Sequence, residues 1–209
     1  MGFTVQAIGP SLPPRLAAVL VAVLALLALA TACDPDPGPG QVAPREPLQV
    51  ELKNPVPIHS EAHEGYEILP IATYDIEARV LSVETYRWDQ GAELAPIDLA
   101  LGWGPMSDVE VLRHFDIGQG YRLFTWRTRE FPIPREDVES HSANVHVIAA
   151  YRSVESQVRQ LRPGDVVRLQ GSLVEARAKS GWTWRSSLTR QDTGNGSCEL
   201  FWVESVQVR

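Results

Sequence analysis

Alternating apolar and polar residues mark half-buried β-strands along the C-terminal two thirds of the chain. Between Tyr74 and Trp88, the apolar residues Ile76, Ala78 and Val80 alternate with charged ones, and a slip of the alternation at 81–83 predicts a β-bulge. Similar patterns predict further strands over 120–129, 145–149, 166–178, 182–190 and 198–208. We therefore expect about six strands.

Helical periodicity is confined to short segments. A capping box over Ser107–Glu110 predicts the start of one short helix, and Pro134–Glu139 has the length of a single helical turn. Ser153 precedes a stretch in which Val154, Val158 and Leu161 share one helical face. The fold class predicted from these elements is α+β, mainly β, with two or three short helices.

The order of three strands, a helix and then further strands is that of the oligonucleotide/oligosaccharide-binding (OB) barrel. The stretch from Leu161 to Glu175 resembles the fourth strand of such barrels, with Gly171 where the strand bends around the corner. We therefore expect residues 65–209 to form a single antiparallel, partly closed, OB-like barrel. The sixth strand and a long insertion at 90–117 would be additions to the minimal barrel.

The first third of the chain has a different pattern. Leu16–Cys33 is an apolar run of 18 residues that follows a lone basic residue, Arg15. Three alternatives fit this run: the core of a cleaved export signal, an uncleaved membrane anchor, or a lipoprotein signal. All three place the remaining residues outside the cytoplasm, in agreement with the absence of a basic residue between Arg15 and Arg45.

The end of this run favours the lipoprotein alternative. Leu29–Cys33 resembles a bacterial lipobox, in which the cysteine is lipidated and becomes the new N-terminus. The resemblance implies lipidation of Cys33, and Asp34 after it implies retention at the inner membrane. Because proline and glycine recur after Cys33, we expect residues 34–64 to be a tether between the signal or anchor (1–33) and the folded domain (65–209).

Charge and cysteine content narrow the functional classes. The formal net charge of −7 makes nucleic acid a poor electrostatic partner. Once Cys33 carries a lipid, Cys198 is the only other cysteine, so we expect no internal disulfide. No motif predicts a cofactor.

The segment between 185 and 199 contains the most conspicuous short motif. Asp192-Thr193-Gly194 is the tripeptide of aspartic proteases, but the residues before it are polar and the chain has no second copy. A structured turn explains the same residues, because Asp, Asn and Gly all accept tight-turn geometry. Such a turn would still present polar side chains to a ligand or partner. The predicted contact residues are Trp103, Arg185, Ser187, Arg190, Asp192 and Asn195.

Two other chemistries are weaker alternatives. Cys198 would be a nucleophile only with His141 or His146 as its base, and an envelope hydrolase would use Asp192, His141, His146 or Cys198, although nothing in the sequence brings these residues together. The histidine spacings match no zinc signature, so we expect no metal site. Tryptophans in strands are usually buried, so we expect a core role for all six except Trp182 or Trp184. For these two, stacking against a sugar ring is the alternative role.

Several longer segments resemble an uncharacterised family of bacterial exported or membrane-associated proteins. The similarity spans about Tyr74 to Glu204, and the run from Trp182 to Glu199 is its most specific part. The other matching segments are IDLALGWGPMSD (97–108), HSANVHVI (141–148) and GDVVRLQGSLVE (164–175). The resemblance implies an envelope location but no catalytic residues. We therefore expect a membrane-anchored, periplasm-facing module without enzymatic activity, which binds or assembles with an envelope protein or a saccharide.

Overall fold

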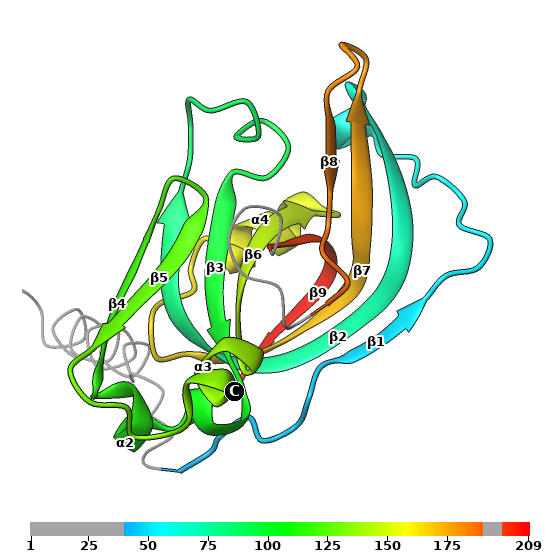
Figure 1. Ribbon diagram of the computed structural model, residues 1–209. Coiled ribbons are helices and arrows are strands. Elements are labelled where there is room, and N and C mark those ends of the chain that lie inside the picture. The colour runs from blue at the N-terminus through cyan, green and yellow to red at the C-terminus, as the bar shows by residue number, and fades with distance from the viewer. Residues whose placement is uncertain (1–39, 190–197) are drawn as a thin grey trace, which may run out of the picture. The chain divides into compact units, whose positions relative to one another are not determined.

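The computed structural model describes residues 40–189 and 198–209 (Figure 1). The predicted membrane segment Leu16–Cys33, including the lipidation residue Cys33, lies outside the described residues. Within the described residues, no helix has both the length and the apolar character needed to cross a bilayer.

Five strands pair with one another in a ring (Figure 1). In pairing order they are β2 (Tyr66–Thr85), β3 (Ile97–Gly102), β6 (Ser142–Ala149), β9 (Glu199–Val208) and β7 (Val166–Ala178), and β7 pairs with β2 again. Four of these pairings are antiparallel, but β6 and β9 run parallel. The predicted α+β, mainly β class is confirmed. The sheet, however, is a mixed and partly closed ring, and the expectation of an antiparallel arrangement fails at the β6–β9 pair.

The ring closes because its long strands bend. The pairing of β2 with β3 shifts register between Val80 and Ser82, which confirms the predicted bulge. On β7 the register with β9 shifts at Gly171, where a β-carbon would lie 2.0 Å from the carbonyl oxygen of Trp202. Gly171 therefore permits the close approach of two backbones at the bend, as the sequence predicted.

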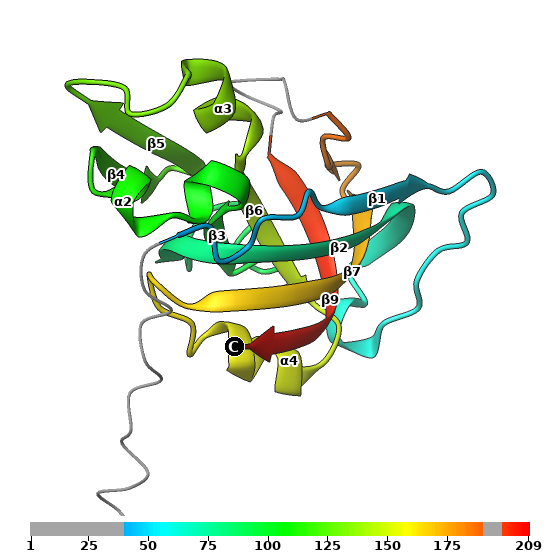
Figure 2. The ribbon, with the colours of Figure 1, turned by 90° about the horizontal axis from the view of Figure 1, so that it is seen from below.

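The interior of the ring is apolar. Leu99, Val145, Val147 and Phe201 belong to one buried cluster with alternating residues of β2 and β7. The helix α4 (Arg152–Val158) contributes Val154 and Val158 to the same cluster, so it packs against the ring as the predicted apolar face requires. Figure 2 shows α4 on one side of the sheet and the insertion between β3 and β6 on another.

The insertion between β3 and β6 has a core of its own. Its elements are η2 (Gly104–Ser107), α2 (Val109–Leu112), β4 (Phe115–Gly120), β5 (Leu123–Thr128) and α3 (Arg135–Ser140). Met106, Phe115 and Val138 pack against Leu81 of β2 and Ala100 of β3. The N-cap of α2 is Asp108, whose side chain accepts a hydrogen bond from the Glu110 amide at 2.9 Å. The insertion therefore holds the two-stranded β4–β5 hairpin against the outside of the ring.

Residues 41–64, which we expected to lie in a tether, are part of the folded unit. Ala43 is fully buried; its amide donates to Ser107 Oγ at 3.1 Å, and its carbonyl accepts from Gly104 at 2.8 Å. The short strand β1 (Leu48–Glu51) pairs with β2, and Ile58 pairs with Ile68 just before η1 (Glu61–His63). Proline and glycine in this segment therefore shape an extended strap along the ring.

Candidate functional site

Three polar side chains occupy the face of β3 and β6 that points away from the ring interior, which we call the outer face. Asp98 of β3 pairs in register with His146 of β6, and Asn144 lies two residues before His146. Asp98 is fully buried, and its Oδ1 lies 2.9 Å from His146 Nδ1 without the alignment of a hydrogen bond. Asp98 Oδ2 has no hydrogen-bond partner among the described residues. A buried carboxylate needs a compensating charge, and Arg122 supplies it.

Arg122 reaches the outer face from the turn of the β4–β5 hairpin. Its Nη1 donates to Asp98 Oδ1 and to the carbonyl oxygen of Ala95, both at 2.7 Å. Its Nε and Nη2 donate to the two carboxylate oxygens of Asp89 at 2.9 and 2.7 Å. The backbone amide of Arg122 also donates to the hydroxyl of Tyr86 at 3.0 Å. One residue thus joins the hairpin turn, the β2–β3 loop and β3, and we call this set of bonds the Arg122 clamp.

The clamp is strongly electrostatic. Burial lowers the pKa of Arg122, but the hydrogen bonds and charges of Asp89 and Asp98 outweigh burial and raise the pKa above its ordinary value. The hydrogen bonds from Arg122 hold the pKa of Asp89 below its ordinary value. Burial raises the pKa of Tyr86, so its hydroxyl stays protonated at neutral pH. The clamp therefore consists of two carboxylates, each bonded to the same guanidinium.

Aromatic rings line the same region. The Arg122 guanidinium lies 3.9 Å from the centre of the Tyr86 ring and 5.6 Å from that of Trp184. Trp184, on β8 (Thr183–Arg185), also packs on His146 with ring centres 4.6 Å apart, and on Trp182 at 5.5 Å. A β-carbon at Gly91 would lie 2.5 Å from the Trp184 ring, so the β2–β3 loop touches β8 directly.

The turn that carries Arg122 is strained. Tyr121 and Arg122 have φ values of 53° and 64°, the left-handed geometry of a type I′ hairpin turn. Asparagine and glycine usually occupy such turns, because a β-carbon there costs about 1–2 kcal/mol per residue. The geometry leaves the Arg122 side chain only 17 % exposed and the Tyr121 residue 97 % exposed. Strain of this kind persists only where surrounding contacts hold it, as the Arg122 clamp does here.

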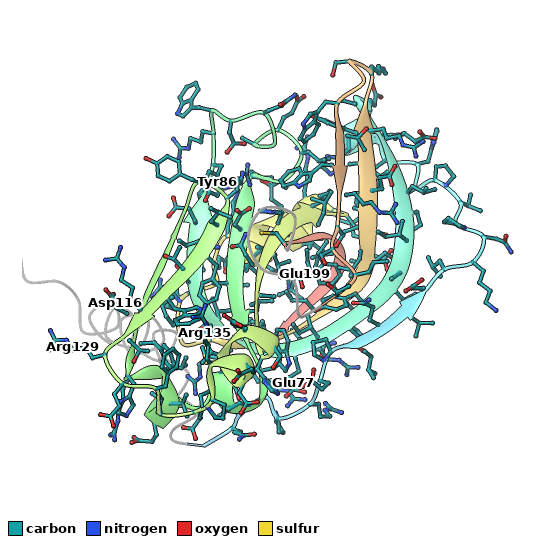
Figure 3. All side chains as sticks on the ribbon, in the orientation of Figure 1. Glu77, Tyr86, Asp116, Arg129, Arg135 and Glu199 are labelled. Carbon is teal, nitrogen blue, oxygen red and sulfur yellow. The ribbon has the colours of Figure 1, made fainter. Side chains whose placement is uncertain are left out.

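A second exposed ring is carried by the β2–β3 loop. Trp88 is 95 % exposed and directly precedes Asp89, as Tyr121 directly precedes Arg122. Because Asp89 and Arg122 are bonded, the two loops that carry these rings are joined at their tips. Figure 3 shows Tyr86 at this end of the hairpin, whereas Asp116 and Arg129 lie toward its other end. We call Trp88 and Tyr121 the exposed pair.

A smaller polar network lies beneath the hairpin. Gln119 donates to Asn144 Oδ1 at 2.7 Å, and Asn144 Nδ2 donates to the carbonyl of Arg122 at 3.1 Å. Cys198 Sγ lies 3.6 Å from Asn144 Nδ2 and 3.7 Å from the carbonyl of Arg122. This network anchors the hairpin turn to β6 and to the start of β9.

The residues predicted as ligand or partner contacts have different surroundings. Trp103 is only 1 % exposed and donates to Glu46 at 3.1 Å, and its burial argues against direct contact with a partner. Arg185 is exposed and paired with Glu175 across β7 and β8. Ser187 is buried, and its amide donates to the carbonyl of Cys198 at 3.1 Å. The remaining three predicted contacts, Arg190, Asp192 and Asn195, lie outside the described residues.

The two histidines contact different groups. His141 Nδ1 is 2.8 Å from the carbonyl of Asp137, and its Nε2 is 3.2 Å from Glu46. His146 instead contacts Asp98 and Trp184. In the part of the chain that the structure describes, no three His, Cys, Asp or Glu side chains gather to hold a metal ion. The hydrolase alternative also needs Asp192, which lies outside the described residues.

The burial of the tryptophans differs in part from the prediction. Trp103 and Trp202 are buried, as expected, and Trp126, Trp182 and Trp184 are partly buried. The expectation of a core role was wrong for Trp88, which is almost fully exposed. Sequence reasoning also missed Arg122 and Tyr121. The available signal was weak: Gly118 and Gly120 precede them, and glycines near a two-residue connection are typical of hairpins.

Comparison of the chain with protein-family models, with curated proteins and with solved structures found no match in any of the three sets. The site therefore has to be interpreted from its own geometry.

Proposed function

We propose that the folded unit is a non-enzymatic binding module of the OB type, anchored at the bacterial inner membrane and facing the periplasm. The strand order supports the OB assignment: the ring runs first, second, third, fifth and fourth strand, with a helix between the third and the fourth. OB barrels bind ligands on the face of their second and third strands and on the adjoining loops. In this chain that face is β3 and β6, where the Arg122 clamp lies.

The observation that carries the proposal is the exposed pair. Trp88 and Tyr121 leave almost their whole side chains in solvent, although burial of a large ring stabilises a fold by about 2 kcal/mol. Both rings are carried on loops that the Arg122 clamp holds rigid, one of them through a strained turn. Rigid, exposed aromatic side chains are typical of binding surfaces, because little conformational entropy is lost when they make contact.

The proposed location is supported by the apolar run that ends at Cys33 and by the short chain between Cys33 and the folded unit. Gly40 donates to the N-cap residue Asp108 of α2, so the described chain enters the fold beside α2. Six residues lie between Cys33 and Gly40, and the seven steps from one Cα to the next span at most about 25 Å when extended. A lipid on Cys33 would therefore tether the folded unit at the membrane surface.

A photocrosslinking experiment tests the proposal. Benzoylphenylalanine is placed at position 121 or 88 of the full chain in living cells, and at position 131 as a control. Phe131 is an exposed aromatic residue that packs on Phe115 and Trp126, and Phe115 lies at the end of the β4–β5 hairpin opposite the turn that carries Tyr121. Illumination should give adducts at 121 and 88 but not at 131. An absence of adducts at both loop positions would refute a binding role for this surface.

A further inference from the structure

A small cavity opens between the strap and the ring. Its walls come from η1, the β2–β3 loop, the first residues of β3 and α4, and the last residues of β6. The cavity has a volume of about 150 Å³. Because segments that are distant in sequence enclose it, the cavity exists only in the folded unit, and the strap supplies one of its walls.

The deep part of the cavity is apolar. Leu94, Ile97 and Val147 line it, and each of these residues is at most 2 % exposed. A cavity of about 150 Å³ with aliphatic walls accommodates one group of the size of benzene. Sites for larger ligands usually have volumes of about 300–1,000 Å³. The space therefore suits a single side chain of the size of leucine or phenylalanine.

Contacts within the protein hold the walls in place. His63 Nε2 lies 3.2 Å from the carbonyl oxygen of Ala149, and the His63 ring packs edge-on against Trp202. A carbonyl oxygen only accepts, so Nε2 carries the hydrogen and the neutral ring keeps Nδ1 as an acceptor. The Leu94 amide donates to the carbonyl of Gly91 at 3.1 Å, which fixes the wall from the β2–β3 loop. A ligand therefore meets a cavity that is already formed, and little ordering entropy is lost on binding.

The mouth of the cavity is charged. The lining residues Glu93 and Arg152 are exposed, and Glu155 is half-buried. Glu155 Oε1 accepts from Nε and Nη2 of Arg159 at 2.9 and 2.6 Å, so its charge is compensated. Neither Glu93 nor Arg152 forms an ion pair with another described residue, and Glu93 accepts a bond of 3.5 Å from the hydroxyl of Tyr66. One positive and one negative side chain at the mouth are therefore available to a ligand.

We propose that this cavity binds a free α-amino acid whose side chain is apolar and of the size of leucine or phenylalanine. The side chain fills the deep part, the α-carboxylate pairs with Arg152, and the α-ammonium group donates to Glu93 and to His63 Nδ1. A residue inside a peptide has neither charge and a peptide terminus has only one, so a free amino acid matches the mouth best. The site does not include Trp88 or Tyr121, so it is a second binding site, beyond the proposed function.

NMR titration of the full chain in detergent, with the methyl groups of Ile, Leu and Val labelled, tests the proposal. L-leucine or L-phenylalanine should shift the methyl resonances of Ile97 and Val147 but not those of Leu48, which is exposed on β1. The dissociation constant should be below about 1 mM. Isoamylamine lacks the carboxylate of leucine and isocaproate lacks its ammonium group, so each should bind about tenfold more weakly.

Three variants locate the site. Arg152→Gln should weaken leucine binding by about tenfold but leave isoamylamine binding unchanged, because isoamylamine has no carboxylate for Arg152. Arg162→Gln, which removes an exposed arginine outside the cavity, is the matched control and should bind normally. Ala149→Leu places a larger side chain in the cavity and should abolish binding, with unchanged Leu48 resonances showing that the fold is intact.

The outcomes separate the ligand class from the site. If neither amino acid shifts Ile97 or Val147 at about 10 mM, the proposal is overturned. Equal affinities for leucine, isoamylamine and isocaproate would leave no role for the two charges and would overturn the amino-acid assignment. Normal leucine binding by both Arg152→Gln and Ala149→Leu would refute the site. Crosslinking at positions 88 and 121 tests a different surface, so either proposal can fail without the other.

Discussion

Arg122 and Asp98 form an ion pair on a strand face where the carboxylate has no exposed surface, with Nη1 2.7 Å from Oδ1. Because Asp98 Oδ2 has no other partner among the described residues, the guanidinium is the main compensation for this buried charge. The pair also fixes the hairpin turn over β3. Its loss should therefore affect both stability and the position of the exposed pair.

Arg122→Met keeps the aliphatic part of the side chain and removes the charge. We expect the free energy of unfolding to fall by about 3 kcal/mol, the usual cost of leaving a buried charge without its partner. Urea unfolding measures it. Arg129→Met, at the exposed end of the same hairpin, should change stability by less than about 0.5 kcal/mol. Adding Asp98→Asn to Arg122→Met should recover part of the loss; no recovery would show that the charge of Asp98 is not the cause.

Tyr121→Asn should make the protein more stable and less able to bind. Asparagine accepts the left-handed geometry at φ 53°, so relief of strain should raise the free energy of unfolding by about 1 kcal/mol. Removal of the ring should at the same time lower the yield of crosslinked adducts or weaken the affinity for the ligand of this surface. Trp88→Asn removes an equally exposed ring at a residue without a positive φ, so it should lose binding without gaining stability. Equal stability changes in the two variants would contradict the strain argument.

The Asp89–Arg122 pair predicts part of the acid sensitivity of the fold. Hydrogen bonds from Arg122 lower the pKa of Asp89 below its ordinary value of 3.8. The unfolded chain therefore takes up this proton first as the pH falls. The stabilisation is complete above pH 3.8 and is lost as the pH falls through the lower value of the folded state. Urea unfolding between pH 7 and pH 2 should show a shallower decline in Asp89→Asn. Asp116→Asn, at the other end of the hairpin (Figure 3), should keep the original decline.

Gly91→Ala tests the contact between the β2–β3 loop and β8. A β-carbon at this position would lie 2.5 Å from the Trp184 ring, so either the loop or the ring has to move. We expect a loss of about 1–3 kcal/mol in stability, as for other overpacked sites, and a shifted Trp184 side-chain resonance in NMR spectra. At Gly65 an added β-carbon meets nothing within 4 Å, so Gly65→Ala is the control and should leave Trp184 unperturbed.

Lipidation of Cys33 is a separate prediction from the sequence. Cells grown with labelled palmitate should incorporate the label into the full chain but not into Cys33→Ala, which should also remain unprocessed. Cys198→Ala removes the other cysteine and should be labelled normally. Incorporation of label into Cys33→Ala would refute the lipoprotein assignment.

The sequence predicted those elements whose residues alternate between two environments. The bulge in β2, the bend at Gly171 and the apolar face of α4 were all visible as local patterns. β3 was missed because all six of its residues are buried and Asp98 is its only charged or polar side chain, so the alternation of polarity is weak. The expected second strand at 120–129 is instead β5 of the hairpin, outside the ring. The parallel pairing of β6 with β9 joins distant segments and leaves no local pattern.

The candidate site was less predictable than the fold. The role of Arg122 depends on a strained turn that places it against Asp89 and Asp98, and none of these three residues belongs to a recognisable motif. Trp88 has the residue type expected of a core position, and only its place on a loop distinguishes it. Trp103, by contrast, lies in a segment that appeared to be a loop but is held in the core by contacts with residues far away in sequence, such as the bond to Glu46.

The last strand of the chain, β9, fits between β6 and β7 and completes the ring. Until residues 199–208 have left the ribosome, β6 and β7 each keep one edge without a neighbour, and the interior stays open to water. Closure of the ring therefore has to wait until β9 has been synthesised, and a chain cut short before β9 should expose the apolar interior to water.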